Sequence, residues 1–186
     1  MSGWEPGADP FPQEKIVKIT DLTHVGELKF VRHAKVHIDL TPKSLWQLAG
    51  GFNAIMTVHP KDGAPYSLTI TAQRGLYTDL SSVPQALWFV VGPIGKHLEI
   101  SILHDYLYMV WTEHRETAAR QDWRFADRMF LAGLKMSGVG WLKRSLMFVA
   151  VHSCIGWRTF LTNPYSLKKR MNDWLPHLDA GHDREN

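Results

Sequence analysis

The stretch that decides the fold is GKHLEISILHDYLYMVW, residues 95–111. Its apolar residues recur at spacings of three and four, which predicts a helix. Such a helix places His104 on an apolar face, because residues three and four apart are neighbours on a helix surface. Asp105 lies about 100° further round the helix, beside that face. The predicted face consists of Ile100, Leu103, His104, Leu107, Tyr108 and Trp111.

A second helix is predicted over residues 118–136, after a turn at residues 112–117. A connection this short makes the two helices antiparallel neighbours. The apolar face of the second helix includes one carboxylate, Asp127. A buried carboxylate is costly unless it is paired, and His104 and Tyr108 on the first helix are candidate partners. The predicted second face consists of Trp123, Ala126, Asp127, Phe130, Leu131 and Leu134.

The N-terminal third predicts a small antiparallel sheet. Residues 16–40 alternate in places with the strand period, and residues 52–59 and 66–73 predict two strands joined by a hairpin loop at 60–65. Residues 41–43 predict a turn, and residues 44–48 a short helical turn. Further helices are predicted at residues 83–90, 140–160 and 166–175.

These elements predict the α+β fold class, with a small antiparallel sheet followed by a helical half built on a central antiparallel helix pair. We expect one domain over residues 16–175, β-rich at 16–75 and helical at 83–175. An irregular arm precedes it at residues 1–15, and a polar tail follows at residues 176–186.

Composition favours a globular protein with a sizeable core. The chain has 186 residues, of which 45% are hydrophobic and 21% are charged, and its formal net charge is +3. No dense basic block predicts specific nucleic-acid binding. Cys154 is the single cysteine, which excludes an internal disulfide and a multi-cysteine metal site. Because Cys154 lies in an apolar run, we expect it to be a buried thiol.

The first residues lack a basic segment followed by an apolar one, so no signal peptide is predicted. No apolar run reaches the roughly 18–20 residues that a transmembrane helix needs. We therefore expect the protein to be synthesised in the cytoplasm, without an export signal or a transmembrane segment.

Four short motifs occur in a fixed order between residues 66 and 157. They are Gly75-x-x-Thr78-Asp79-x-x-Ser82-Val83-Pro84, His104-Asp105-Tyr106-Leu107-Tyr108, Ala126-Asp127-x-x-Phe130 and Ala150-Val151-x-x-x-x-Gly156. Together they resemble a domain-of-unknown-function family common in tailed bacteriophages and prophages. This resemblance implies a phage gene product and supplies no activity.

The helix pair alone is similar to the catalytic helices of bacterial secreted phospholipases A2. The resemblance implies that His104 is a general base, that Asp105 binds Ca²⁺, and that Asp127 holds the histidine in one tautomer. Tyr108, one turn beyond His104, is placed to hydrogen-bond Asp127, and Asp79 is the natural second Ca²⁺ ligand. The sequence departs from that family because it has one cysteine and no recognisable glycine-rich calcium loop.

Several other readings of the same residues stay open. An Asp127–His104 or Asp127–Tyr108 pair can be purely structural. His104, Asp105, Asp127 and Asp79 also suit a transition metal such as Zn²⁺, Mn²⁺ or Fe²⁺. Asp122 competes with Asp127, but its place near the helix start predicts exposure. The residue pair 81–82 offers serine nucleophiles without the glycine elbow that would present them.

We therefore hold two hypotheses about function. The first is a phage-encoded, Ca²⁺-assisted ester hydrolase that acts on phospholipid of the host envelope, with His104, Asp127 and Tyr108 as catalytic residues and Asp105 and Asp79 as metal ligands. The second is a non-enzymatic virion component, such as a tail or tail-tip protein bound to other virion proteins. In that case the cluster is a buried polar brace.

Overall fold

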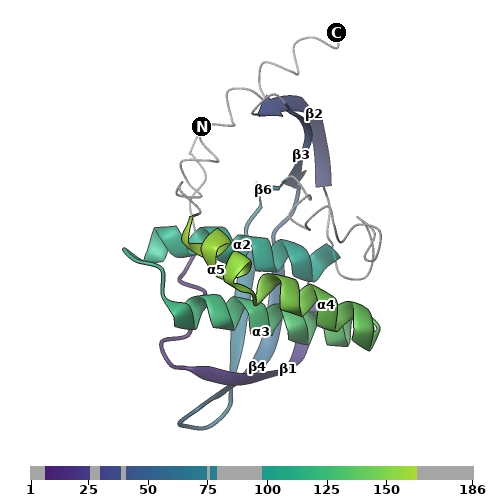
Figure 1. Ribbon diagram of the computed structural model, residues 1–186. Coiled ribbons are helices and arrows are strands. Elements are labelled where there is room, and N and C mark those ends of the chain that lie inside the picture. The colour runs from purple at the N-terminus through teal and green to yellow at the C-terminus, as the bar shows by residue number, and fades with distance from the viewer. Residues whose placement is uncertain (1–6, 26–29, 39–40, 75, 79–97, 163–186) are drawn as a thin grey trace.

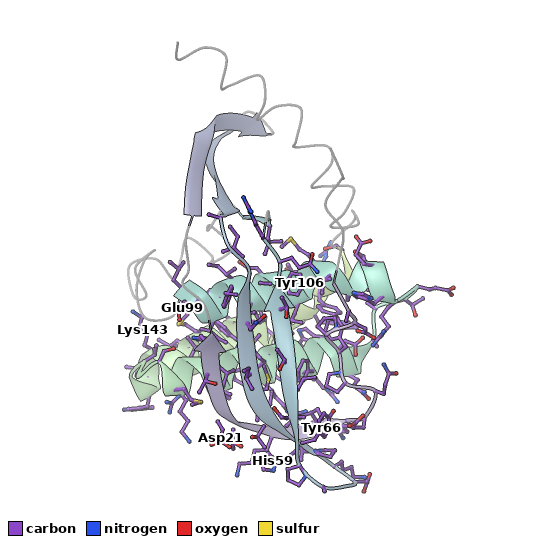
Figure 2. All side chains as sticks on the ribbon, turned by 180° about the vertical axis from the view of Figure 1, so that it is seen from behind. Asp21, His59, Tyr66, Glu99, Tyr106 and Lys143 are labelled. Atoms are coloured by element: carbon purple, nitrogen blue, oxygen red, sulfur yellow. The ribbon has the colours of Figure 1, made fainter. Side chains whose placement is uncertain are left out.

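The computed structural model describes residues 7–25, 30–38, 41–74, 76–78 and 98–162. These residues form an α+β fold in which a three-stranded sheet carries a pair of helices on one face. Two further helices lie on the other side of that pair (Figure 1). Figure 2, viewed from behind, shows the sheet in front of the helices, with His59 and Tyr66 near the hairpin end of the sheet. The predicted fold class is confirmed.

The sheet that supports the helices contains β1 (Ile16–Val25), β4 (Phe52–Pro60) and β5 (Tyr66–Ala72), in the order β1-β4-β5 with antiparallel pairing. β4 and β5 form the predicted hairpin, and every second residue of β4 is buried. This alternation is the strand period, with one face of β4 turned to the core. β1 has an irregularity in its pairing between Thr20 and Thr23, where Asp21 has a positive φ of 52°.

A second sheet projects from the body (Figure 1) and contains β2 (Phe30–Ile38), β3 (Thr41–Leu48) and β6 (Tyr77–Thr78). The turn expected at residues 41–43 and the helical turn expected at 44–48 were wrong. Residues 41–48 instead form a strand that pairs with β2 from Ile38↔Thr41 to Phe30↔Leu48. Pairing with the preceding strand satisfies backbone groups that a single helical turn leaves open.

The helical half contains α2 (Leu98–His114), α3 (Arg120–Met136), α4 (Trp141–Val151) and α5 (Cys154–Leu161). The predicted helices at 95–111 and 118–136 correspond to α2 and α3, which pack against each other. None of the described helices is long and apolar enough to cross a bilayer. The helices expected at 83–90 and 166–175 lie outside the described residues.

The single helix expected over residues 140–160 was wrong, because the chain breaks at His152 and Ser153 between α4 and α5. Ser153 caps α5 by accepting a hydrogen bond from the Gly156 backbone amide at 3.3 Å. Gly156 lies so close to the Val151 carbonyl that a Cβ atom has no room there. The break also exposes Cys154, which was expected to be buried.

The core joins the buried face of the sheet to α2 and α3. Besides its predicted face, α2 also buries Ile102, Tyr106 and Val110, which explains why its sequence is almost continuously apolar. The N-terminal arm takes part in this core, since Phe11 is buried and meets Phe125 edge to face at 6.3 Å between ring centroids.

Gly133 of α3 packs directly against Ile100 of α2. A Cβ atom at this position would lie 2.1 Å from Cγ1 of Ile100. We expect Gly133→Ala to lower the free energy of unfolding by about 2 kcal/mol, the usual range for overpacking a core. Urea unfolding of Gly133→Ala, Ile100→Ala and the double variant measures this effect. Because the clash is with a side chain, the double variant should recover at least about 1 kcal/mol relative to the sum of the two single changes. Additive losses would contradict this reading of the contact.

Candidate functional site

Asp127 is the centre of a polar cluster inside the helical half. Its carboxylate is 0% exposed and lies on α3, facing α2 and the α4–α5 junction. Oδ1 lies 3.1 Å from Nε2 of His104 and 2.8 Å from the Tyr108 hydroxyl. Oδ2 lies 2.7 Å from Nδ1 of His152. Three side chains from two other parts of the chain therefore meet one buried carboxylate.

The carboxylate determines where the protons on both imidazoles lie. An ionised carboxylate only accepts hydrogen bonds, so His104 donates through Nε2–H and His152 donates through Nδ1–H. The opposite nitrogen of each neutral ring, Nδ1 of His104 and Nε2 of His152, then carries a lone pair and is able to take a proton. This is the arrangement by which a carboxylate orients a histidine as a general base.

Tyr108 connects the cluster to the surrounding aromatic side chains. Its hydroxyl donates to Asp127 and accepts a hydrogen bond of 3.0 Å from Nε1 of Trp123. Burial, reinforced by the negative charge of Asp127, raises the pKa of Tyr108 well above its ordinary value. The hydroxyl therefore remains a proton donor to Asp127 at every physiological pH.

His104 is enclosed by its neighbours, with 5% of the residue exposed. Its ring packs on Tyr108 at 4.2 Å and on Phe130 at 4.7 Å between centroids. Its Nδ1 atom lies 4.0 Å from Oδ1 of Asp105, the next residue on α2, whose side chain is partly exposed. The proton-accepting nitrogen of His104 therefore faces the residue predicted to bind a cation.

His152 is the member of the cluster that sequence reasoning did not identify. Its imidazole stacks between Trp123, at 4.8 Å, and Phe148, at 4.9 Å, and its side chain is 35% exposed. The signal in the sequence was weak: His152 interrupts an apolar run inside the Ala150-Val151-x-x-x-x-Gly156 motif. Of the two imidazoles that bind Asp127, His152 is the one more accessible to solvent.

Asp122 was expected to be exposed, and this was wrong. Its carboxylate is buried and accepts a hydrogen bond of 3.1 Å from Nε of Arg115. Nη1 of the same arginine donates to Asp9 of the N-terminal arm at 2.6 Å. Burial raises the pKa of Asp122 despite the opposing effect of Arg115. The pair ties the arm to the start of α3.

The predicted metal ligands do not form a complete site within the part of the chain that the structure describes. Asp105 lies beside His104, whereas Asp79 and the serines at 81 and 82 are outside the described residues. Among the described side chains, no group of three or more His, Cys, Asp and Glu has metal-binding geometry. Ca²⁺ therefore stays a prediction that rests on Asp105 and Asp79.

Comparison with known proteins shows that part of the chain is similar to a family of unknown function. Residues 60–151 match a family described as protein of unknown function, DUF1353. This part of the chain is similar to the DUF1353 family. The DUF1353 match runs from the end of β4 to the end of α4, and so includes His104, Tyr108 and Asp127. It stops one residue before His152 and excludes β1. No curated protein and no solved structure shows significant similarity to the chain.

Proposed function

We propose that this protein is a phage-encoded hydrolase that uses an imidazole oriented by Asp127 to activate water for attack on the carboxylic ester of a phospholipid in the host envelope. The observation that carries the proposal is the fully buried Asp127 carboxylate, which binds His104, Tyr108 and His152 at once. A carboxylate that is hydrogen-bonded to an imidazole can orient that imidazole as a general base for hydrolysis, and Tyr108 helps to hold the carboxylate in place.

The reaction balances with the residues of the cluster. A water molecule gives a proton to Nδ1 of His104 while its oxygen bonds to the ester carbonyl carbon. Collapse of the tetrahedral adduct breaks the bond to the alcohol oxygen, which takes the proton back from the imidazolium. Asp127 stabilises that imidazolium through Nε2, at 3.1 Å, and Tyr108 fixes the carboxylate. A Ca²⁺ ion on Asp105 and Asp79 would polarise the ester carbonyl.

His152 supplies a second proton acceptor of the same kind. Its Nδ1 atom is bound to Asp127 at 2.7 Å, and the ring is more exposed than that of His104. Both imidazoles are therefore hydrogen-bonded to Asp127, whose negative charge stabilises the imidazolium that forms when the ring takes a proton. Asp105 favours His104 as the base, since it places a carboxylate for a cation 4.0 Å from the proton-accepting nitrogen.

A second function is favoured by burial. His104 and Asp127 are almost sealed from solvent among the described residues, and a sealed cluster of this kind suits a polar brace in a virion component such as a tail protein. In that case the Asp127 contacts stabilise the helical half and no chemistry takes place. The two functions predict different outcomes in one assay.

The test is release of fatty acid from vesicles of phosphatidylglycerol and phosphatidylcholine, with Ca²⁺ and with chelator. His104→Asn should lower kcat by about 100-fold, the usual contribution of a general base, and Asp105→Asn should abolish the Ca²⁺ dependence. His59→Asn is the matched control, because His59 lies on the far end of β4 and bonds Thr20 (Figure 2). His152→Asn decides which imidazole is the base, since the base variant shows the larger loss of kcat.

Circular dichroism and thermal unfolding establish that each variant is folded. Absence of hydrolysis by the wild-type protein, together with a loss of stability in both His104→Asn and His152→Asn, would overturn the enzymatic proposal. The same result would support the brace.

A further inference from the structure

The outer surface of α4 is apolar although it faces away from the core. Figure 1 shows α4 and α5 as the layer furthest from the sheet. Trp141 is 71% exposed and Val149 is 66% exposed, and Leu142 and Leu146 are exposed beside them. At the helical period these four residues share one face, whereas Met147 on the opposite face is buried. On α5, Ile155 is 72% exposed.

The polar side chains on this layer satisfy their own hydrogen bonds. Ser145 donates to the Trp141 carbonyl at 2.8 Å, Thr159 to the Ile155 carbonyl at 2.9 Å, and Thr162 to the Arg158 carbonyl at 2.8 Å. These hydroxyls are exposed, and each bonds back to the helix instead of depending on water. Serine and threonine on helices commonly bond the carbonyl four residues earlier in this way. The layer can therefore lose its hydration without leaving these donors unpaired.

The charged side chains on α4 and α5 have one sign. They are Lys143, Arg144 and Arg158, and neither helix contains Asp or Glu. Lys143 and Arg144 follow Trp141 and Leu142 on α4, so by the helical period they flank the apolar face on its two sides. An apolar face on two helices whose charged side chains are all cationic is the pattern of a surface that lies in the headgroup region of an anionic membrane.

We propose that the outer face of α4 and α5, formed by Trp141, Leu142, Leu146, Val149 and Ile155, binds the surface of an anionic phospholipid bilayer. A second copy of this face is a poorer partner, because two surfaces bordered by cations repel each other. The binding is independent of the proposed hydrolysis, since adsorption to a membrane breaks no bond.

The test is co-sedimentation of the full-length protein with vesicles of phosphatidylglycerol and phosphatidylcholine, and with vesicles of phosphatidylcholine alone. We expect binding to the anionic vesicles that weakens as the salt concentration rises. Val149→Asp should weaken it about tenfold or more, and Arg144→Glu about tenfold. Val17→Asp and Lys18→Glu are the matched controls, because both residues are exposed on β1, in the layer furthest from α4. These controls should bind as the wild-type protein does.

Circular dichroism establishes that each variant is folded. Equal binding by Val149→Asp and Val17→Asp, or no binding to anionic vesicles by the wild-type protein, would overturn the proposal. Concentration-dependent dimerisation that Val149→Asp abolishes, without vesicle binding, would also overturn it and assign the face to a protein contact. The two proposals can fail separately. If the wild-type protein hydrolyses no ester, but both it and His104→Asn bind anionic vesicles, the membrane-binding proposal is supported and the hydrolase proposal fails.

Discussion

Replacing Asp127 with alanine is expected to lower the free energy of unfolding by about 4 kcal/mol, the range measured when one partner of a buried charged network is removed. The change leaves the Tyr108 hydroxyl and one nitrogen each of His104 and His152 without the acceptor that they now share. Each buried donor left without a partner adds its own desolvation cost. Urea unfolding followed by circular dichroism measures the loss.

Two comparisons make this result specific. Asp62→Ala changes an exposed carboxylate in the β4–β5 hairpin loop and should alter stability by less than about 0.5 kcal/mol. Asp127→Asn keeps the shape of the side chain but turns one acceptor atom into a donor, so its loss should lie between those of the other two variants. A loss below about 1 kcal/mol in Asp127→Ala would show that the cluster does not hold the helices together.

Gly156→Ala is the second change with a large expected effect. A Cβ atom at residue 156 would lie 1.6 Å from the carbonyl oxygen of Val151. This oxygen belongs to the backbone, so no side-chain rotation can relieve the clash. The α4–α5 junction must open to relieve the clash. We expect a loss of about 3 kcal/mol in stability, at the upper end of the overpacking range. We also expect His152 to move away from Asp127.

Gly140→Ala provides the control for Gly156→Ala. Gly140 precedes α4, its φ is −53°, and a Cβ atom there meets nothing within 4 Å. That substitution should be neutral or slightly stabilising, because alanine restricts the unfolded chain. The His152 imidazole signal in proton NMR reports on its contact with Asp127. An unchanged signal and unchanged stability in Gly156→Ala would contradict the role of this glycine in forming the junction.

The central helix pair and its polar contacts were accessible from sequence for a simple reason. α2 and α3 are long apolar-faced segments, and α3 repeats with the helical period, so the faces that meet could be listed before the structure was known, although α2 buries more than its predicted face. A carboxylate on an apolar face demands a donor, and the candidates, His104 and Tyr108, lie on the neighbouring helix. Both contact Asp127 in the structure. The catalytic roles assigned to these residues remain proposals.

The features that sequence reasoning missed depend on contacts beyond local pattern. Residues 41–48 form a strand because β2 is available as a partner, which overrides the turn signal of Pro42. Asp122 is buried because Arg115 and the N-terminal arm close over it. The break at residue 152 depends on the contact of Gly156 with Val151. Because the helix breaks there, Cys154 is exposed and His152 contacts Asp127.

The contacts of the polar cluster are more local in sequence than the contacts that join α3 to the sheet. The three partners of Asp127 lie 19, 23 and 25 residues from it, whereas the contacts of α3 with β1, from Arg128 to Ile16 and from Met136 to Leu22, close loops of 112 and 114 residues. Closing a loop of about 23 residues costs roughly 1.4 kcal/mol less chain entropy than closing one of about 112. We therefore expect the contacts of Asp127 to form before the contacts that join α3 to β1.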